Sequence, residues 1–255
     1  MKPEICSLFP VPNLLETESL LCIQPHPDDM EIGAGATIAR LIEKGTRVSC
    51  LTVTDGSAGS YDLQTSPTEL RKRRRKETEQ SAALLGVKEL LWLDFKDGGN
   101  LPYEETREKI TRAIRQLKPQ AVMVCDPWLP YEVHTDHIRT GLAAAEAAFL
   151  ANMPNFYPAQ LQEECKPHAV KMIAFYYTAY PNTFIGADST WALKMKAISC
   201  HASQFTPLKL EELEVFLKAK GRAYNDRHQS EHGLVEAFKV LSPAHLHILE
   251  EAWRC

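Results

Sequence analysis

The chain lacks the cysteine spacing of a disulfide or zinc framework. It has seven cysteines, an odd number, and no C-x-x-C pair. Cys22, Cys50 and Cys125 lie within apolar runs, where a thiol behaves as a small core residue. These features predict a chain that works in a reducing compartment, and the cytoplasm is the simplest one.

Signals for membranes and nucleic acids are also scarce. No apolar stretch approaches the roughly 20 residues of a membrane span. No basic segment followed by an apolar one opens the chain, so we expect no signal peptide. The net charge of the 255 residues is -4, with 44% hydrophobic and 24% charged residues. We therefore expect a globular protein without a basic field for nucleic acid or for an anionic membrane.

Two familiar catalytic motifs are missing. The chain has no G-x-S-x-G elbow, which argues against a serine hydrolase of the Ser-His-Asp type. Gly33 and Gly35 have no third glycine at the spacing of a dinucleotide fingerprint, because residue 38 is isoleucine. We expect these two glycines to ease close packing of a helix on a sheet.

Strand-like and helix-like segments alternate along the chain. The expected strands are 19–24, 47–54, 88–93, 121–125 and 171–177, and the expected helices are 34–44, 67–85, 103–117, 137–151, 189–200 and 208–228. Segment 152–170 has no clear period, and 236–241 reads as a late strand or a helix edge. The alternation predicts a Rossmann-like α/β fold in which helices flank a mostly parallel sheet. We expect one domain over residues 1–255.

Two clusters of acids and histidines follow two of the apolar runs. PHPDD occupies residues 25–29, and HTDH occupies residues 134–137. Ligands of open α/β sheets bind outside the carboxyl ends of the strands, so the two clusters are expected to meet there. Imidazole nitrogen and carboxylate oxygen are zinc ligands, and a catalytic zinc site leaves one position for water. Either motif alone is more often a polar loop or a helix cap, but the pair favours a metal site.

Spacing within the clusters suggests separate roles. His26 and Asp29 are three residues apart, so a tight turn can aim both at one point, with His137 as a third ligand. Asp28 lies between them and would point elsewhere, where it could take a proton from a water on the metal. His134 is left over, one turn from His137.

The clusters belong to an ordered set of motifs that resembles the LmbE-like (PIG-L) family of N-acetylglucosamine deacetylases. The set comprises PHPDDMEIG at 25–33, TDG at 54–56, RRKE at 74–77, SA at 81–82, LGV at 85–87, HTDH at 134–137, HASQ at 201–204 and EAF at 236–238. The ordered set is far more specific than any single motif. The resemblance implies an LmbE-like fold and a hydrolase that removes the N-acetyl group from an amino-sugar conjugate.

The same resemblance implies a ligand set and an acid-base group. His26, Asp29 and His137 would bind one zinc ion per chain, although another divalent metal could occupy such a site. The metal would activate a water. Asp28 would be the general base and would later deliver the proton to the leaving amine. A protonated His134, held by Asp136, would stabilise the oxyanion.

Four further residues are expected to contact the substrate. Arg74 could hold a sugar hydroxyl or a carboxylate, and its alternative is a helix pair with Glu77. Asp97 could bind a sugar hydroxyl or be a turn aspartate. His201 could contact substrate or be a buried structural histidine. Tyr131 could approach the oxyanion, although its spacing to His134 is unusual for the family.

The substrate-facing wall departs from the family pattern. Residues 127–133 read PWLPYEV where the family has a glycine-rich approach, and Thr135 replaces a proline. The expected substrate is a small N-acetylglucosaminyl conjugate, such as the malate glycoside of the bacillithiol pathway. An amidase acting on another acylated conjugate and a non-catalytic metal-binding protein are the alternatives. The resemblance also implies a homo-oligomer.

Overall fold

A single sheet of seven strands organises the structure, in the order β3-β2-β1-β4-β5-β7-β6. The computed structural model describes residues 10–163, 165–228 and 231–255. The strands are β1 (Ser19–Gln24), β2 (Arg47–Thr54), β3 (Glu89–Phe95), β4 (Ala121–Cys125), β5 (Met172–Tyr176), β6 (Thr183–Gly186) and β7 (Val235–Leu241). The first five strands run parallel, and β7 is antiparallel to both β5 and β6.

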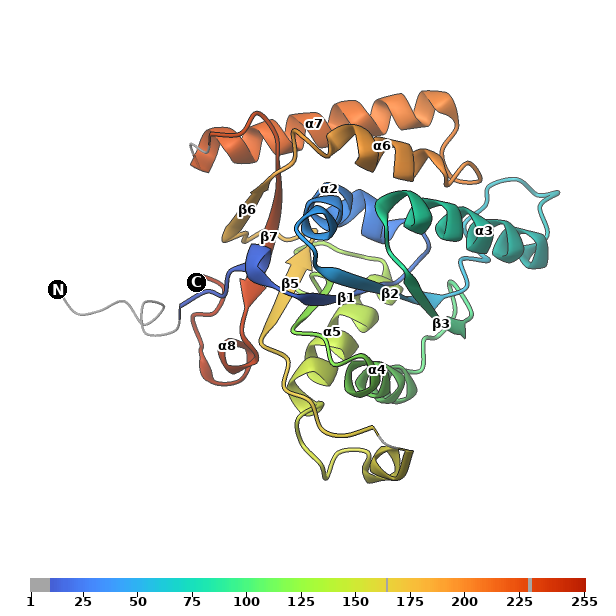
Figure 1. Ribbon diagram of the computed structural model, residues 1–255. Helices are drawn as coiled ribbons and strands as arrows, with labels where there is room; N and C mark the ends of the chain where they lie inside the picture. Colours follow the sequence, from blue (N-terminus) through green and yellow to red (C-terminus); the bar gives the residue numbers. More distant parts are fainter. Residues whose placement is uncertain (1–9, 164, 229–230) are drawn as a thin grey trace.

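Helices cover both faces of this sheet (Figure 1). They are α2 (Asp29–Glu43), α3 (Pro67–Leu85), α4 (Tyr103–Leu117), α5 (Thr135–Leu150), α6 (Trp191–Ser199), α7 (Pro207–His228) and α8 (Pro243–Ile248), with short 3-10 turns η1 (Leu14–Glu16) and η2 (Pro158–Glu163). In Figure 1, α2 and α3 lie on one face and α4 and α5 on the other, while α6 and α7 lie outside α2. The predicted α/β architecture is confirmed. Over the described ranges, no helix combines the length and the apolarity needed to cross a bilayer.

Local signals set several of these boundaries. The side chain of Ser66 accepts a hydrogen bond from the Glu69 backbone N–H, with Pro67 at the first helical position of α3. Gly86 ends the helix at φ = 88°, in the left-handed region that glycine adopts without strain. The predicted limits of this helix are therefore confirmed, because both of its ends have a strong cap.

The strand order places β4 beside β1, although the two strands are far apart in the sequence. From β1 the chain moves outward to β2 and β3, and then returns to β4 on the other side of β1. All six residues of β1 and all five of β4 are buried. This reversal is the topological switch point of an open sheet, where ligands bind beyond the carboxyl ends of the strands.

Some elements differ from the sequence-based expectation. The helix expected from about residue 34 begins at Asp29. The earlier start was not expected because Asp29 and Glu31 are polar, although both are buried in the structure. The ambiguous segment at 236–241 is a strand, and β6 and α8 were not predicted. Both missed elements are short, and short elements have little periodicity to detect.

Gly33 supports close packing of α2 on the sheet. A Cβ atom at Gly33 would lie 2.5 Å from Cδ2 of Tyr176 on β5, whereas one at Gly35 would lie 3.1 Å from Cγ of Lys194. The fully buried ring of Tyr176 cannot move aside. Gly33→Ala is therefore expected to destabilise the protein by about 1–3 kcal/mol through overpacking. Urea unfolding should detect this loss, and Gly35→Ala, which meets a flexible chain, should cost less. Equal stability of Gly33→Ala and the unsubstituted protein would contradict the packing role.

Candidate active site

The two acid-histidine clusters lie together at the carboxyl ends of β1 and β4. Residues 25–29 leave β1 and enter α2, and His134 precedes the first turn of α5. The ring centroids of His26 and His137 are 5.3 Å apart. The sheet topology alone therefore joins segments that are separated by more than a hundred residues.

Three predicted ligands converge on one point. Nδ1 of His26 lies 3.2 Å from Oδ2 of Asp29, and the other oxygen of Asp29 lies 3.5 Å from Nε2 of His137. One ligand atom from each residue falls within 4.8 Å of the others. Two imidazoles and a carboxylate form a donor set that suits a borderline divalent metal such as zinc.

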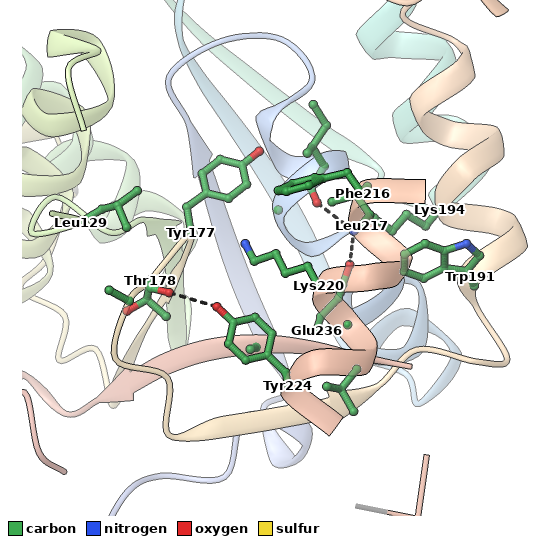
Figure 2. A pocket seen from close by; sticks show the side chains of 16 residues that line it. Leu129, Tyr177, Thr178, Trp191, Lys194, Phe216, Leu217, Lys220, Tyr224 and Glu236 are labelled. Atoms are coloured by element: carbon green, nitrogen blue, oxygen red, sulfur yellow. Dashed lines mark hydrogen bonds and ion pairs between the residues drawn. The ribbon is translucent and has the colours of Figure 1, made fainter. Parts of the chain in front are cut away.

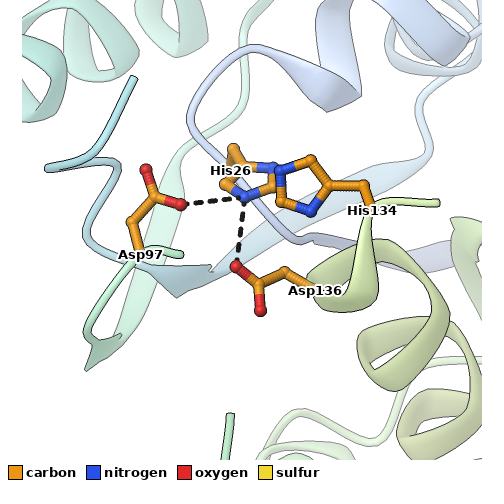
Figure 3. A group of neighbouring side chains, drawn as sticks. All are labelled: His26, Asp97, His134 and Asp136. Atoms are coloured by element: carbon orange, nitrogen blue, oxygen red, sulfur yellow. Dashed lines mark ion pairs between the residues drawn. The ribbon is translucent and has the colours of Figure 1, made fainter. Parts of the chain in front are cut away.

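Carboxylates lie opposite the remaining ring nitrogens. Nε2 of His26 is 3.2 Å from Asp97 Oδ1 and 3.5 Å from Asp136 Oδ2 (Figure 3). Nδ1 of His137 is 3.4 Å from Glu132 Oε2. Metal-bound histidines commonly have a carboxylate at the second nitrogen, which fixes the tautomer and the ring orientation. This pattern favours Nδ1 of His26 and Nε2 of His137 as the ligand atoms.

A second donor group overlaps the first. His26, Asp97, His134 and Asp136 also offer atoms within 4.8 Å of one another. This group would use Nε2 of His26, with Asp29 at the other ring nitrogen, and it would leave His137 and Glu132 without a part in the metal site. The first group leaves each carboxylate with an orienting function, so it accounts for more of the arrangement.

The carboxylates of the cluster shift the pKa values of two of its histidines. Although burial lowers it, contacts with Asp136, Asp29 and Asp97 raise the pKa of His26 well above its usual value. Burial likewise lowers the pKa of His137, but the Asp29 carboxylate raises it overall. Both imidazoles can therefore hold protons among the carboxylates. A divalent metal would displace these protons, so its affinity should rise with pH.

Asp28 has an unusual backbone and an unusual carboxyl group. Its φ of 119° lies in the left-handed region, which costs a non-glycine residue roughly 1–3 kcal/mol. Burial raises its pKa to about 6, although the Arg74 guanidinium opposes that shift. A carboxyl group with this pKa can accept and donate a proton near neutral pH. Strain and a raised pKa at one residue are typical of a functional group.

Arg74 holds Asp28 in this position. Its guanidinium donates to Asp28 Oδ2 at 3.2 Å and to the backbone carbonyls of Pro27 at 2.6 Å and Gly56 at 3.1 Å. A Cβ at Gly59 would lie 2.7 Å from the guanidinium. The loop after β2 thus packs on the arginine, which explains the glycines there. Glu77, the alternative partner of Arg74, instead accepts hydrogen bonds from Ser203.

His134 is the exposed histidine of the group. Its ring stacks on His137 with centroids 4.9 Å apart and meets the edge of His26 at 4.4 Å. Burial and these two histidines lower the pKa of His134. The expected link to Asp136 differs in the structure, where Asp136 faces His26 and accepts from the backbone N–H of Gly98. Asp136 lies inside the first turn of α5 and His134 just outside it, and both side chains are directed toward His26 (Figure 3).

Two predicted substrate contacts lie away from the cluster. His201 is fully buried, with Nε2 at 3.3 Å from Glu31 Oε1, and the same oxygen accepts from Ser81. This position favours the structural alternative for His201. Tyr131 is 97% exposed and has φ = 67°, so it does not face the metal ligands in this structure. Asp97 is buried beside His26 and also accepts from the Ala58 N–H.

Two residues at the site were not predicted. Glu132 lies in the run before the second cluster, and sequence alone gave no reason to choose it. Tyr177 follows β5, donates to the Asp29 carbonyl at 3.4 Å and stacks on His137 with centroids 6.2 Å apart. The strand-end rule that identified the clusters applies to Tyr177 as well, because β5 ends one residue earlier.

A cavity opens over these groups. Its volume is about 300 Å³, and it is lined by His26, Asp28, Ala58, Gly59, Arg74, Asp97, Gly98, His134 and Gln204. The size is that of a small-molecule site. The proposed base and the proposed oxyanion group both line it, so a reacting amide can reach the two together.

Comparison with known proteins adds a family assignment to this geometry. The PIG-L family profile, described as GlcNAc-PI de-N-acetylase, matches residues 21–148. A diacetylchitobiose deacetylase of Thermococcus kodakarensis is 39% identical over 91% of this chain and 86% of its own length. A probable N-acetyl-alpha-D-glucosaminyl L-malate deacetylase 2 of Bacillus anthracis is 29% identical over 76% of this chain and 84% of its own.

A solved structure agrees with the sequence relatives. The N,N'-diacetylchitobiose deacetylase from Pyrococcus horikoshii, complexed with its inhibitor MPG, superposes with a TM-score of 0.87 at 39% identity. The match covers 92% of this chain and 88% of that one. The likeness therefore extends over most of the chain and is not confined to the segments that carry the two clusters.

Proposed function

Because the chain belongs to the PIG-L family of GlcNAc-PI de-N-acetylases, we propose that it hydrolyses the N-acetyl group of an N-acetylglucosaminyl conjugate. The observation that carries the proposal is the convergence of His26, Asp29 and His137 beside a buried, strained Asp28. This arrangement places a metal-ligand set next to a proton acceptor, and His26 and Asp28 line the same cavity. A binding or structural metal site would not need the proton acceptor.

The relatives favour one conjugate over the others. Two proteins that are 39% identical to this chain are named for diacetylchitobiose, and the malate-conjugate relative is 29% identical. We therefore propose N,N'-diacetylchitobiose, or another short N-acetylglucosamine oligomer, as the first substrate to test. This choice replaces the malate glycoside that the sequence motifs suggested, which becomes the second.

A metal ion fits the residues present. His26, Asp29 and His137 would hold it, and Asp97, Asp136 and Glu132 would orient the two imidazoles. When bound, a divalent metal such as zinc polarises the amide carbonyl and acidifies a water molecule.

The residues of the chain supply the proton transfers. Asp28 accepts the proton of the attacking water and later delivers it to the leaving amine, so the proton is conserved over the reaction. Arg74 holds the Asp28 carboxylate toward the cavity. A protonated His134 donates to the oxyanion of the tetrahedral intermediate, where negative charge develops.

The pH profile should be a narrow bell. Asp28 must be ionised, so the rate falls as the pH drops through its pKa of about 6, and a bound cation moves this limb to lower pH. His134 must be protonated, so the rate falls as the pH rises through a pKa that is lowered from the usual histidine value. His134→Ala should remove or shift the alkaline limb of kcat/KM. An alkaline limb that stays unchanged in this variant would assign that limb to the water instead.

Arg74→Lys should lower kcat by about tenfold to a hundredfold, because the single nitrogen of lysine cannot reproduce the planar fork with which two guanidinium nitrogens reach Asp28 and two carbonyls. The loss should be similar for N-acetylglucosamine and for an acidic conjugate. The acid limb of the pH profile should move up, since the guanidinium lowers the pKa of Asp28. A selective rise in KM for the acidic conjugate would instead support the direct substrate contact suggested by the sequence.

A substrate panel tests the proposal as a whole. The zinc-loaded protein should release acetate from N,N'-diacetylchitobiose, with slower release from N-acetylglucosaminyl malate and from the inositol conjugate. If none of these three compounds releases acetate but another acylated compound does, the amidase alternative is favoured. No release from any compound by a protein that binds metal would favour a non-catalytic metal protein.

A further inference from the structure

A second and larger cavity lies beside the active site, on the other side of Tyr177. Its volume is about 440 Å³, and α2, α6, α7 and the end of β5 contribute to its walls. We call it the α7 cavity. Figure 2 shows Tyr177, Trp191, Lys194, Lys220, Tyr224 and Glu236 around it. None of its lining residues lines the active-site cavity described above.

One lysine of the α7 cavity is fully neutralised. Nζ of Lys194 lies 2.6 Å from Glu236 Oε1 and also donates to the Ile32 carbonyl at 2.8 Å. The Glu236 carboxylate further accepts from the backbone N–H groups of Ala36 and Thr37. Glu236 therefore has three donors already, and its negative charge is matched by Lys194.

The other lysine has no carboxylate partner. Nζ of Lys220 lies 5.8 Å from the ring centre of Tyr177 and 5.9 Å from that of Tyr224. No carboxylate of the described residues approaches Nζ within 4.0 Å, and Figure 2 shows the side chain extending toward Tyr177. Burial and the nearby Lys194 lower the pKa of Lys220. Two tyrosine faces compensate such a cation only in part.

We propose that the α7 cavity binds a small organic carboxylate with an apolar ring, with Lys220 as the cation that pairs with the carboxylate. Trp191 and Tyr224 offer flat walls for the ring, and Lys220 supplies the one charge that is not balanced within the cavity. A charge-assisted hydrogen bond in this half-buried setting is stronger than one in water. The proposal is independent of the proposed deacetylase activity.

The position of the α7 cavity links it to catalysis through one residue. Tyr177 lines the cavity, stacks on the proposed metal ligand His137 and donates to the Asp29 carbonyl. A bound carboxylate would contact the face of this wall that is turned away from the metal. The site is therefore separate from the substrate cavity but shares a wall with its ligands.

Calorimetric titration of the metal-loaded protein with benzoate, and with neutral benzamide, tests the proposal. Benzoate should bind, and benzamide should bind at least about tenfold more weakly. Lys220→Met should weaken benzoate binding by about tenfold or more, whereas Lys220→Arg should largely keep it. Lys218→Met is the matched control, because Lys218 lies on the same helix but pairs with Glu214 outside the cavity lining.

Three results would overturn the proposal: no benzoate binding, equal binding of benzamide, or benzoate binding that survives Lys220→Met. The last result is also the one expected if benzoate binds only at the metal. Thermal unfolding should verify that Lys220→Met is folded. If it is not, a crystal of the unsubstituted protein soaked in benzoate decides, since the carboxylate must lie within hydrogen-bond distance of Lys220 Nζ.

Discussion

Asp28→Asn is expected to lower kcat by about 100- to 10,000-fold while the protein keeps its metal. Asp28 is next to the ligand Asp29, but its side chain points to Arg74 rather than to the two histidines. Asparagine keeps the shape and tolerates the left-handed φ of 119°, which alanine would strain. The variant therefore removes proton transfer without removing the ligand set or the backbone conformation.

Metal analysis and steady-state kinetics on the same preparation check this prediction. Asp29→Asn is the matched control, because it changes the adjacent carboxylate, and it should lose metal as well as activity. If Asp28→Asn turns over normally, Asp28 is not the base. If it loses metal as completely as Asp29→Asn, Asp28 is a ligand instead.

His137→Ala is expected to abolish metal binding and to lower the rate by about 1,000-fold or more, since metal stabilisation of the reacting carbonyl contributes several kcal/mol. The variant removes one of the two imidazoles in the favoured group, and it leaves Glu132 without a histidine to orient. Equilibrium dialysis with zinc, followed by elemental analysis, measures the loss.

Asp97→Asn separates the two overlapping donor groups. In the favoured group Asp97 orients His26 and does not bind the metal. Its replacement by asparagine should therefore lower the affinity for the metal by about 10- to 100-fold. If the second group held the metal, Asp97→Asn would remove a ligand, and His137→Ala would keep the metal. If the His137→Ala variant binds as much metal as the unsubstituted protein, the proposed ligand set is contradicted.

The sequence predicted the fold where local signals are strong. β1, β2, α4 and β4 have the expected limits, and α3 has them because Ser66 and Gly86 cap it. The start of α2 was missed because its first turn contains the acidic residues Asp29 and Glu31, whose burial depends on partners from distant segments. The antiparallel β7 was ambiguous for a similar reason, since its pairing with β5 and β6 is a tertiary property.

The site was predictable in outline but not in its contacts. The two clusters could be expected to meet because strand ends of one sheet share an edge. The partners of each side chain could not be predicted. Arg74 lines the cavity, and its hydrogen bond to Asp28 was not foreseen, while Asp136 was expected at His134 and faces His26. Such pairings depend on side-chain directions, which neither spacing nor motif order specifies.

The substrate was the least predictable feature. The relatives of this chain are named for chitobiose, malate and inositol conjugates, so membership of the family does not distinguish the group attached to the sugar. Overall similarity, rather than any motif, favours the chitobiose compound.

The most direct test of the account is the stoichiometry of products from N,N'-diacetylchitobiose with the zinc-loaded protein. Acetate and free amine should appear in equal amounts, and removal of the metal by a chelator should stop both until zinc is restored. Metal-dependent hydrolysis of the acetamide is what the convergence of His26, Asp29 and His137 beside Asp28 predicts. Absence of both products with this and other N-acetylglucosamine conjugates, in a protein with full metal occupancy, would contradict the account.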